Sequence, residues 1–325
     1  MKGFDPRFAD LPDYILKITE EIWEGRGVAT LRHTYGVDIP MRNAMALSIG
    51  NEAVIDGTLA TLAEFPDRQL LGEDVIWSGD EDAGFLSSHR LVTHGTHTGH
   101  GLFGPPTGRS FTIRAIADCF CIADRITDEW LIRDSGGIAV QLGTTPEAVA
   151  RDMLRREGAR PRRPFTPDQD VPGPYGGRGN DNEWGGRLAA VLQAVMDKDV
   201  AAIGREYDRA VRTEHPGGRG GWGRGFAEAE WMRLRAAFPR AEFQVHHAIG
   251  REDPRQPPRA AVRWSLTGEH AGFGRWGEPT GAPVHVMGIT HAEWGPWGLR
   301  REFTLWDEVA VWKQVLLHIQ SAPGD

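Results

Sequence analysis

The chain has 325 residues, enough for two domains of ordinary size, and its 40% hydrophobic and 25% charged residues are typical of a globular protein. A net charge of −8 disfavours nucleic acid and anionic membranes as partners. No run approaches the ~18 apolar residues that cross a bilayer, and the first residues lack an apolar secretory segment, so we expect a cytoplasmic protein that does not bind membranes.

The first part of the chain changes from helical to strand-like spacing. Residues 15–23 and 55–62 carry apolar side chains at the three- and four-residue intervals of amphipathic helices. The second of these helices must end before Pro66, which cannot continue it. From there the period approaches two, as in FTIRAIADCFCIA (111–123) and DEWLIRD (128–134), with glycine-rich turns between segments. Helices followed by antiparallel strands predict an α+β fold.

Two short features of these strands could suggest metal or redox chemistry. In THGTHTGHG, His94 and His100 share one strand face while His97 points the other way, so the three cannot meet on one ion without a severe kink. We therefore expect no metal site. Cys119 and Cys121 also share one face, and we interpret them as small buried residues in a reducing compartment.

The chain then repeats itself at a constant offset of 173 residues. HTGHGLFGPPTG from His97 aligns with HAGFGRWGEPTG from His270, and residues 90–134 share 12 of 45 positions with residues 263–307. The same offset aligns Glu129 with Glu302 and Asp134 with Asp307. Between the copies lies a segment rich in Pro, Gly and Arg. We predict one domain over residues 10–152, a linker over 153–184 and a second domain over 185–322.

The glycine-rich strand and the hairpin after it resemble the SnoaL-like polyketide cyclases of the nuclear transport factor 2-like superfamily. GTHTGHGLFGPPTGR is similar to that family's T-G-x-x-x-G-x-x-P-T-G, and DRITDEWLIRDSGGIAVQLG to its later hairpin. The resemblance implies two tandem cone-shaped half-barrels, each a curved antiparallel sheet around helices that encloses an apolar pocket. It also implies that the two sheets pack as an internal pseudo-dimer, and that two chains could associate further as a homodimer.

The resemblance further implies a cofactor-free reaction in which the hairpin aspartate exchanges a proton with a carbon acid, often beside a histidine. By position that aspartate is Asp134 in the first copy and Asp307 in the second. His291 and Glu293 stand where the companion residue is expected in the second copy. The first copy has Asp118 and Phe120 there, which puts its activity in doubt.

Strand parity predicts the surroundings of these aspartates. Trp130, Ile132 and Asp134 share one face, as Phe303, Leu305 and Asp307 do, and a carboxylate on an apolar face has a raised pKa suited to acid/base work. With the hairpin centred near residue 124, Asp134 lies opposite Arg114, and an ion pair would instead keep its pKa low. By the same parity Trp306 points away from Asp307, toward a sheet-to-sheet interface.

The predicted catalytic residues are therefore Asp307, His291 and Asp134. Further candidates for the pocket are residues near the glycine-rich strand, the hairpin and the loop after the first helix, and each could equally be structural: His97, His270, Asp118, Trp130, Tyr35, His215 and Glu293.

Three functions fit these features. The favoured one is acid/base chemistry on a small, largely apolar carbonyl compound, by aldol cyclisation or isomerisation. The second is a binding protein that holds an apolar molecule without turnover. The third is a hydrolase or dehydratase, in which a pair such as His291 and Asp307 would flank a water or a leaving hydroxyl.

Overall fold

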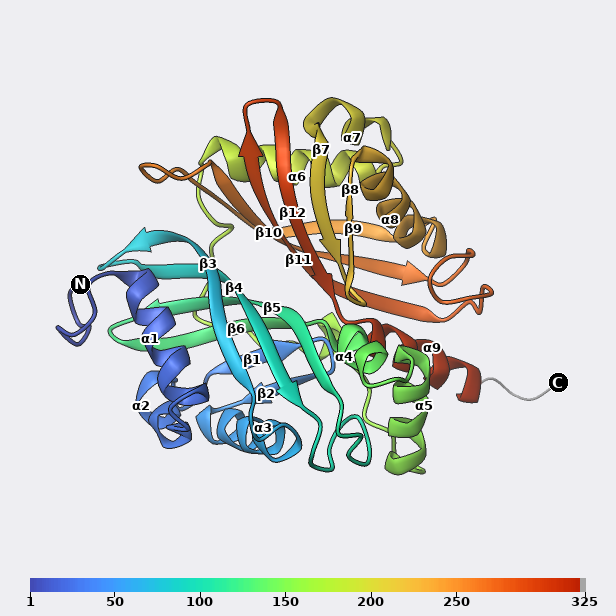
Figure 1. Ribbon diagram of the computed structural model, residues 1–325, viewed down its shortest axis with the longest axis horizontal. Coiled ribbons are helices and arrows are strands. Elements are labelled where there is room, and N and C mark those ends of the chain that lie inside the picture. The colour runs from blue at the N-terminus through green and yellow to red at the C-terminus, as the bar shows by residue number, and fades with distance from the viewer. Residues whose placement is uncertain (322–325) are drawn as a thin grey trace.

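The computed structural model describes residues 1–321, and its first half opens with helices and continues with strands (Figure 1). Asp10 caps the first helix by accepting a hydrogen bond from the Asp13 amide. The elements of this half are α1 (Leu11–Trp23), η1 (Val28–Thr30), α2 (Leu31–Thr34), β1 (Pro40–Asn43), β2 (Ala46–Ile49), α3 (Asn51–Glu64), β3 (Gln69–Asp80), β4 (Gly84–Thr96), β5 (Ser110–Ile122), β6 (Arg125–Arg133), α4 (Ser135–Gln141) and α5 (Pro146–Glu157).

The second half repeats this order after an extended connection that contains the single turn η2 (Pro167–Gln169). Its elements are α6 (Glu183–Met196), α7 (Ala201–Glu206), β7 (Tyr207–His215), β8 (Arg219–Trp222), α8 (Arg224–Ala237), β9 (Glu242–Arg251), β10 (Arg259–Glu269), β11 (Pro283–Gly295), β12 (Gly298–Trp306) and α9 (Glu308–Ser321). The short hairpins β1–β2 and β7–β8 were not predicted, because strands of about four residues show no clear period.

Both halves have the same sheet topology. The strand orders are β2-β1-β6-β5-β4-β3 and β8-β7-β12-β11-β10-β9. The neighbouring strands are antiparallel except for the pairs β1–β6 and β7–β12, which are parallel. The chain is thus two tandem α+β cones: the repeat predicts the two copies, and the family resemblance implies the cone shape.

Each sheet is covered on both faces. In the first half, α1 and α3 pack on the face that carries Ala117, Cys119 and Cys121, and both cysteines are free and buried. The opposite face packs on the second sheet (Figure 1), where Trp130 and Ile132 join a cluster with side chains of β11 and β12. The two sheets therefore form an internal pseudo-dimer.

The connection and the last helix tie the halves together. Helix α5 extends to Glu157, into the predicted linker, and α6 begins at Glu183, two residues before the predicted second domain. Tyr175 of the connection packs against both clusters between the sheets. Helix α9 packs beside α5 of the first half through Val309 and Leu316 (Figure 1). Within residues 1–321, no helix is long and apolar enough to cross a membrane.

Candidate active site

The first half encloses a cavity of about 180 Å³ between its sheet and the helices α1 and α3. Much of the wall is apolar and comes from both layers, with Ile22, Trp23, Val54, Leu91, Ala117 and Leu131. The polar lining is Thr19, Tyr35, Asn43, Ser48, Thr58, Arg68, His89, Glu129 and Arg133. A concave space in which apolar side chains and converging polar groups meet is typical of a small-molecule site.

A second hollow of about 390 Å³ adjoins this cavity. Asn43, Arg68, Leu131 and Arg133 border both spaces and so form a neck between them. Apolar side chains dominate the outer hollow, which we call the mouth: Phe65, Leu102, Phe103, Ile138 and Met153. Asp307 of the second half also borders the mouth.

Glu129 is the acid/base group of the inner cavity. It lies on β6, where it pairs with Cys119 of β5 and Met41 of β1, so the neighbouring strands hold its backbone on both sides. Burial raises the pKa of Glu129 to about 7, while the charge of Arg133 and a hydrogen bond with Tyr35 act to lower it. A carboxyl group with such a pKa is present in both protonation states near neutral pH and can accept or return a proton.

His89 is the second titratable group of the cavity wall. Burial lowers the pKa of His89 to about 4, so its imidazole is neutral at pH 7. Its Nδ1 lies 3.2 Å from the Ser87 hydroxyl oxygen. If that hydroxyl donates to Nδ1, then Nε2 carries the proton and can donate it to a ligand oxygen.

The face of the β6 strand that forms the cavity is not the one expected from the sequence. Trp130 and Ile132 lie between the two sheets with Met287, Ile289 and Leu305, whereas Glu129, Leu131 and Arg133 line the cavity. The predicted alternation of side chains along β6 was confirmed, but the face predicted to line the cavity was wrong. Both faces are buried, so apolar character could not distinguish the cone interior from the interface between sheets.

The structure places the two hairpin aspartates as helix caps. Asp134 accepts hydrogen bonds from the Gly137 amide of α4 and from the Gly217 and Gly218 amides of the second half. The Asp134 amide bonds to the Arg114 carbonyl, which agrees with the predicted register. The Arg114 side chain, however, pairs with Glu73 and Glu214, not with Asp134.

Asp307 makes the corresponding contacts in the second half. It accepts from the Val309 and Ala310 amides at the start of α9 and from the Ser135 hydroxyl of the first half at 2.6 Å. Burial raises the pKa of Asp307 to about 6, and it lies at the mouth rather than in the inner cavity. His291 is separated from it, since its ring nitrogens contact Ser88 and Arg90.

Three of the other predicted pocket residues belong to the interface between the sheets. Asp118 accepts from the Ser88 hydroxyl at 2.5 Å and from the Arg263 guanidinium at 3.2 Å. The same guanidinium stacks on Trp130, 3.7 Å from the ring centre. Glu293 faces Arg90 and Arg301 at 3.7 and 3.5 Å. These contacts join the halves and leave the side chains outside the inner cavity.

Two of the predicted histidines, His97 and His270, have structural partners at Nδ1. His97 and His270 are buried and equivalent, with Nδ1 at 3.2 Å from Thr107 and 3.1 Å from Thr280. His215 lies in the second cone, where burial lowers its pKa to about 3. Of the predicted pocket residues, Tyr35 lines the inner cavity. Within residues 1–321, no three His, Cys, Asp or Glu side chains are arranged to hold a metal ion.

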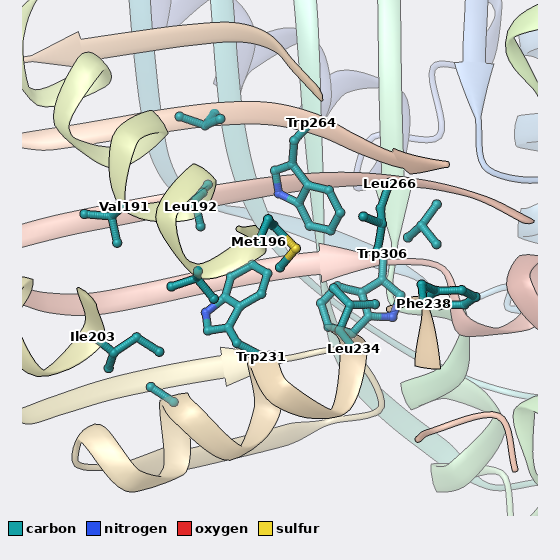
Figure 2. Close-up of a cluster of buried hydrophobic side chains, with 14 of the residues drawn as sticks. Val191, Leu192, Met196, Ile203, Trp231, Leu234, Phe238, Trp264, Leu266 and Trp306 are labelled. Atoms are coloured by element: carbon teal, nitrogen blue, oxygen red, sulfur yellow. The ribbon is translucent and has the colours of Figure 1, made fainter. Parts of the chain in front are cut away.

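Three tryptophans fill the second cone at the positions that line the cavity in the first. At the offset of 173 residues, the second copy has Trp231, Trp264 and Trp306 in the places of Thr58, Leu91 and Arg133. The ring centres of these indoles lie 6.1, 6.2 and 6.4 Å apart, and all three are fully buried (Figure 2). The expectation that Trp306 lies at the sheet interface was wrong, because that residue points into its own cone.

The second cone nevertheless keeps part of the polar arrangement. The Tyr207 hydroxyl donates to Glu302, which also accepts from the Thr304 hydroxyl at 2.7 Å. Glu302 corresponds to Glu129 at the offset of 173, and Tyr207 corresponds to Tyr35, since both bridge to equivalent residues of the last strand of their half. Burial raises the pKa of Glu302, but its carboxyl group contacts protein atoms instead of a cavity.

Comparison with known proteins identifies the first half. Residues 8–142 match the SnoaL-like polyketide cyclase family. This part of the chain belongs to that family. Among solved structures, wild-type IdmH from Streptomyces antibioticus shares 26% identity over 41% of this chain and 98% of its own, with a TM-score of 0.36. TsrD from Streptomyces laurentii shares 21% over 41% of this chain and 93% of its own, with a TM-score of 0.35. No curated protein sequence matches the chain.

The sequence analysis did not select Glu129, Arg68, His89 or Arg133 as site residues. One signal was present for Glu129, because the repeat preserves it as Glu302. The other three have no such signal, since the second copy has Ala241, Val262 and Trp306 in their places. Only the closure of the cone brings these three residues to one cavity.

Proposed function

We propose that the SnoaL-like first half is an acid/base enzyme that acts on a small, largely apolar carbonyl compound, with Glu129 as the catalytic base. The observation that carries the proposal is a buried carboxyl group with a pKa of about 7 on the wall of a cavity that is lined by polar and apolar side chains in similar measure. Removing a proton next to a carbonyl requires a base of this strength held away from bulk water.

The groups around Glu129 support a complete proton cycle. The ionised carboxylate takes a proton from the carbon beside the carbonyl, and the C–H electron pair becomes the enolate. His89 lines the same cavity and can stabilise the enolate oxygen. The enolate carbon then bonds to a second carbonyl carbon of the same molecule, and Glu129 returns the proton to the new alkoxide. In an isomerisation the proton returns to a different carbon.

The test compares three carboxyl variants in a proton-exchange assay. A panel of small ketones and keto acids is incubated with the protein in D₂O, and the loss of hydrogen next to the carbonyl is followed by NMR. We expect Glu129→Gln to lower the protein-dependent rate by about 10²–10⁴-fold, the usual contribution of a general base. Glu302→Gln is the matched control, because it makes the same change in the filled cone.

The Asp307→Asn variant distinguishes the proposal from the expectation based on the family resemblance. Asp307 caps α9 and borders the mouth, so we expect its loss to lower the rate less than the loss of Glu129. If Asp307→Asn abolishes exchange while Glu129→Gln does not, the base is Asp307. If compounds bind but the wild-type protein gives no exchange above that of buffer, the first cone is a binding site without turnover.

A further inference from the structure

Arg68 differs from the other buried arginines of the protein. Within residues 1–321, five arginines have less than a tenth of their surface exposed. Four of them pair with carboxylates, as Arg42 does with Asp128 and Asp170, and the others are Arg90, Arg259 and Arg263. Arg68 is 3% exposed and has no carboxylate within 4.0 Å among the described residues.

Arg133 borders the same neck and also has no carboxylate partner at ion-pair distance among residues 1–321. Among residues 1–321 no carboxylate oxygen lies within 4.0 Å of its guanidinium, and no hydrogen bond joins its side chain to the rest of this region. The side chain of Arg68 donates one bond, from Nε to the Thr93 hydroxyl, which leaves its two terminal nitrogens free to face a ligand. Each arginine borders both the inner cavity and the mouth.

Two such cations near each other are unfavourable without an anion. Burial and the charge of Arg133 together lower the pKa of Arg68 to about 9, and the more distant carboxylate of Glu64 offsets this only in part. Packing alone does not compensate for an unpaired buried charge, because its desolvation cost is large unless a counterion accompanies it. The aromatic rings around Arg68, such as Trp23 at 5.5 Å, provide only a weak substitute.

We infer that Arg68 and Arg133 form a carboxylate-binding site at the neck, and that the ligand of the first cone is a monoanion with an otherwise apolar body. Guanidinium groups bind carboxylates through paired, charge-assisted hydrogen bonds. The carboxyl groups of Glu129, Glu64 and Asp307 also border these spaces and act on the two arginines at longer range, so a carboxylate monoanion meets less repulsion there than a phosphate dianion. The inference deepens the proposed function, on which it rests for the reaction that the ligand undergoes.

The strand geometry sets where the ligand's two ends lie. Glu129 and Arg133 are four residues apart on β6, so their Cα atoms are about 13 Å apart at ~3.3 Å per residue. The carboxylate is held at the neck while the opposite end of the molecule reaches Glu129 in the inner cavity. The substrate is thus a carboxylic acid whose reacting carbon is several atoms from the carboxyl group. In the filled second cone, Ala241 and Trp306 replace both arginines.

The test measures binding with hexanoate and its uncharged isostere, hexanamide, by isothermal titration calorimetry. We expect wild-type protein to bind hexanoate at least tenfold more tightly than hexanamide, and Arg133→Gln to remove this preference. Arg125→Gln is the matched control, since Arg125 is an exposed arginine on the same strand. Arg68→Lys provides a second variant that retains the charge but loses paired bonding. We expect it to weaken hexanoate binding by less than Arg133→Gln.

Other outcomes would overturn the inference. Equal binding of hexanoate and hexanamide, or an unchanged preference in Arg133→Gln, would show that no carboxylate site exists. Tighter binding of inorganic phosphate than of hexanoate would assign the site to a phosphoryl group instead. The Glu129→Gln variant tests the carboxylate-binding proposal separately from the catalytic proposal. It should retain or strengthen hexanoate binding while losing exchange activity, so a failure of the catalytic proposal leaves the binding result intact.

Discussion

The two cones share a topology and a Tyr–Glu pair, yet the first has a cavity at this pair and the second packs three indoles at the equivalent wall positions. In the first, Glu129 lines about 180 Å³ of enclosed space. In the second, Glu302 lies in a core that includes Trp231, Trp264 and Trp306. The difference shows that the size of a few wall residues decides whether a cone has a ligand cavity. A buried carboxyl group alone does not make a cone a binding site. We interpret the second half as a scaffold whose sheet covers the first.

Filling the cavity of the first cone is the most direct test of whether this cavity accounts for the difference between the two halves. Thr58→Trp copies Trp231 into α3 and should abolish ligand binding and lower activity roughly 100-fold or more, because the substrate can no longer reach its productive position. Leu59→Trp is the control, since Leu59 is the next residue and is half exposed. Retained activity in Thr58→Trp would mean that the reaction takes place outside this cavity.

The reverse substitution should reduce stability instead of activity. Trp231→Thr removes a fully buried indole from the second cone, and we expect it to lower the free energy of unfolding by about 3–5 kcal/mol. Urea denaturation measures this loss, with Thr58→Ala in the first cone as the matched change at a cavity wall. A loss as small as that of Thr58→Ala would contradict a solid second cone.

A third prediction uses the pH dependence of stability to test the Glu129 environment. Because burial raises the pKa of Glu129 from 4.5 to about 7, the folded state favours its protonated form. This stabilisation is present below pH 4.5 and is lost as the pH rises through 7, by about 3 kcal/mol. The difference in unfolding free energy between wild type and Glu129→Gln should therefore fall over that range. A difference that does not change with pH would mean an ordinary pKa for Glu129.

The smallest expected effect concerns the tyrosine beside each glutamate. The hydrogen bond with Tyr35 lowers the pKa of Glu129, so Tyr35→Phe should shift the rising limb of the pH–rate profile to higher pH. Tyr207→Phe removes the equivalent hydroxyl from Glu302 and should change stability by about 1 kcal/mol without moving that limb. Equal shifts in both variants would show that the halves are not functionally distinct.

The sequence alone determined the architecture. The offset of 173 residues and the helical and strand periods predicted two α+β copies, and the strand period predicted that Asp134 lies opposite Arg114 in the hairpin, whereas the cone shape was implied by the family resemblance. These features follow from local spacing and turn chemistry, which a single chain displays directly. The repeat also marked Glu129 and Glu302 as equivalent, although nothing in the sequence assigned them to the cavity.

Only the tertiary structure decided which face of each strand encloses a ligand. Residues 130 and 132 are as apolar as a pocket wall, but they are buried by the other sheet, which a period of two cannot reveal. The neck arginines come from the end of β6 and from the residue before β3, and their approach depends on how the sheet curves around α1 and α3. The contrast between a cavity and a solid core depends on the summed volume of side chains from several elements, which becomes apparent only when they pack together.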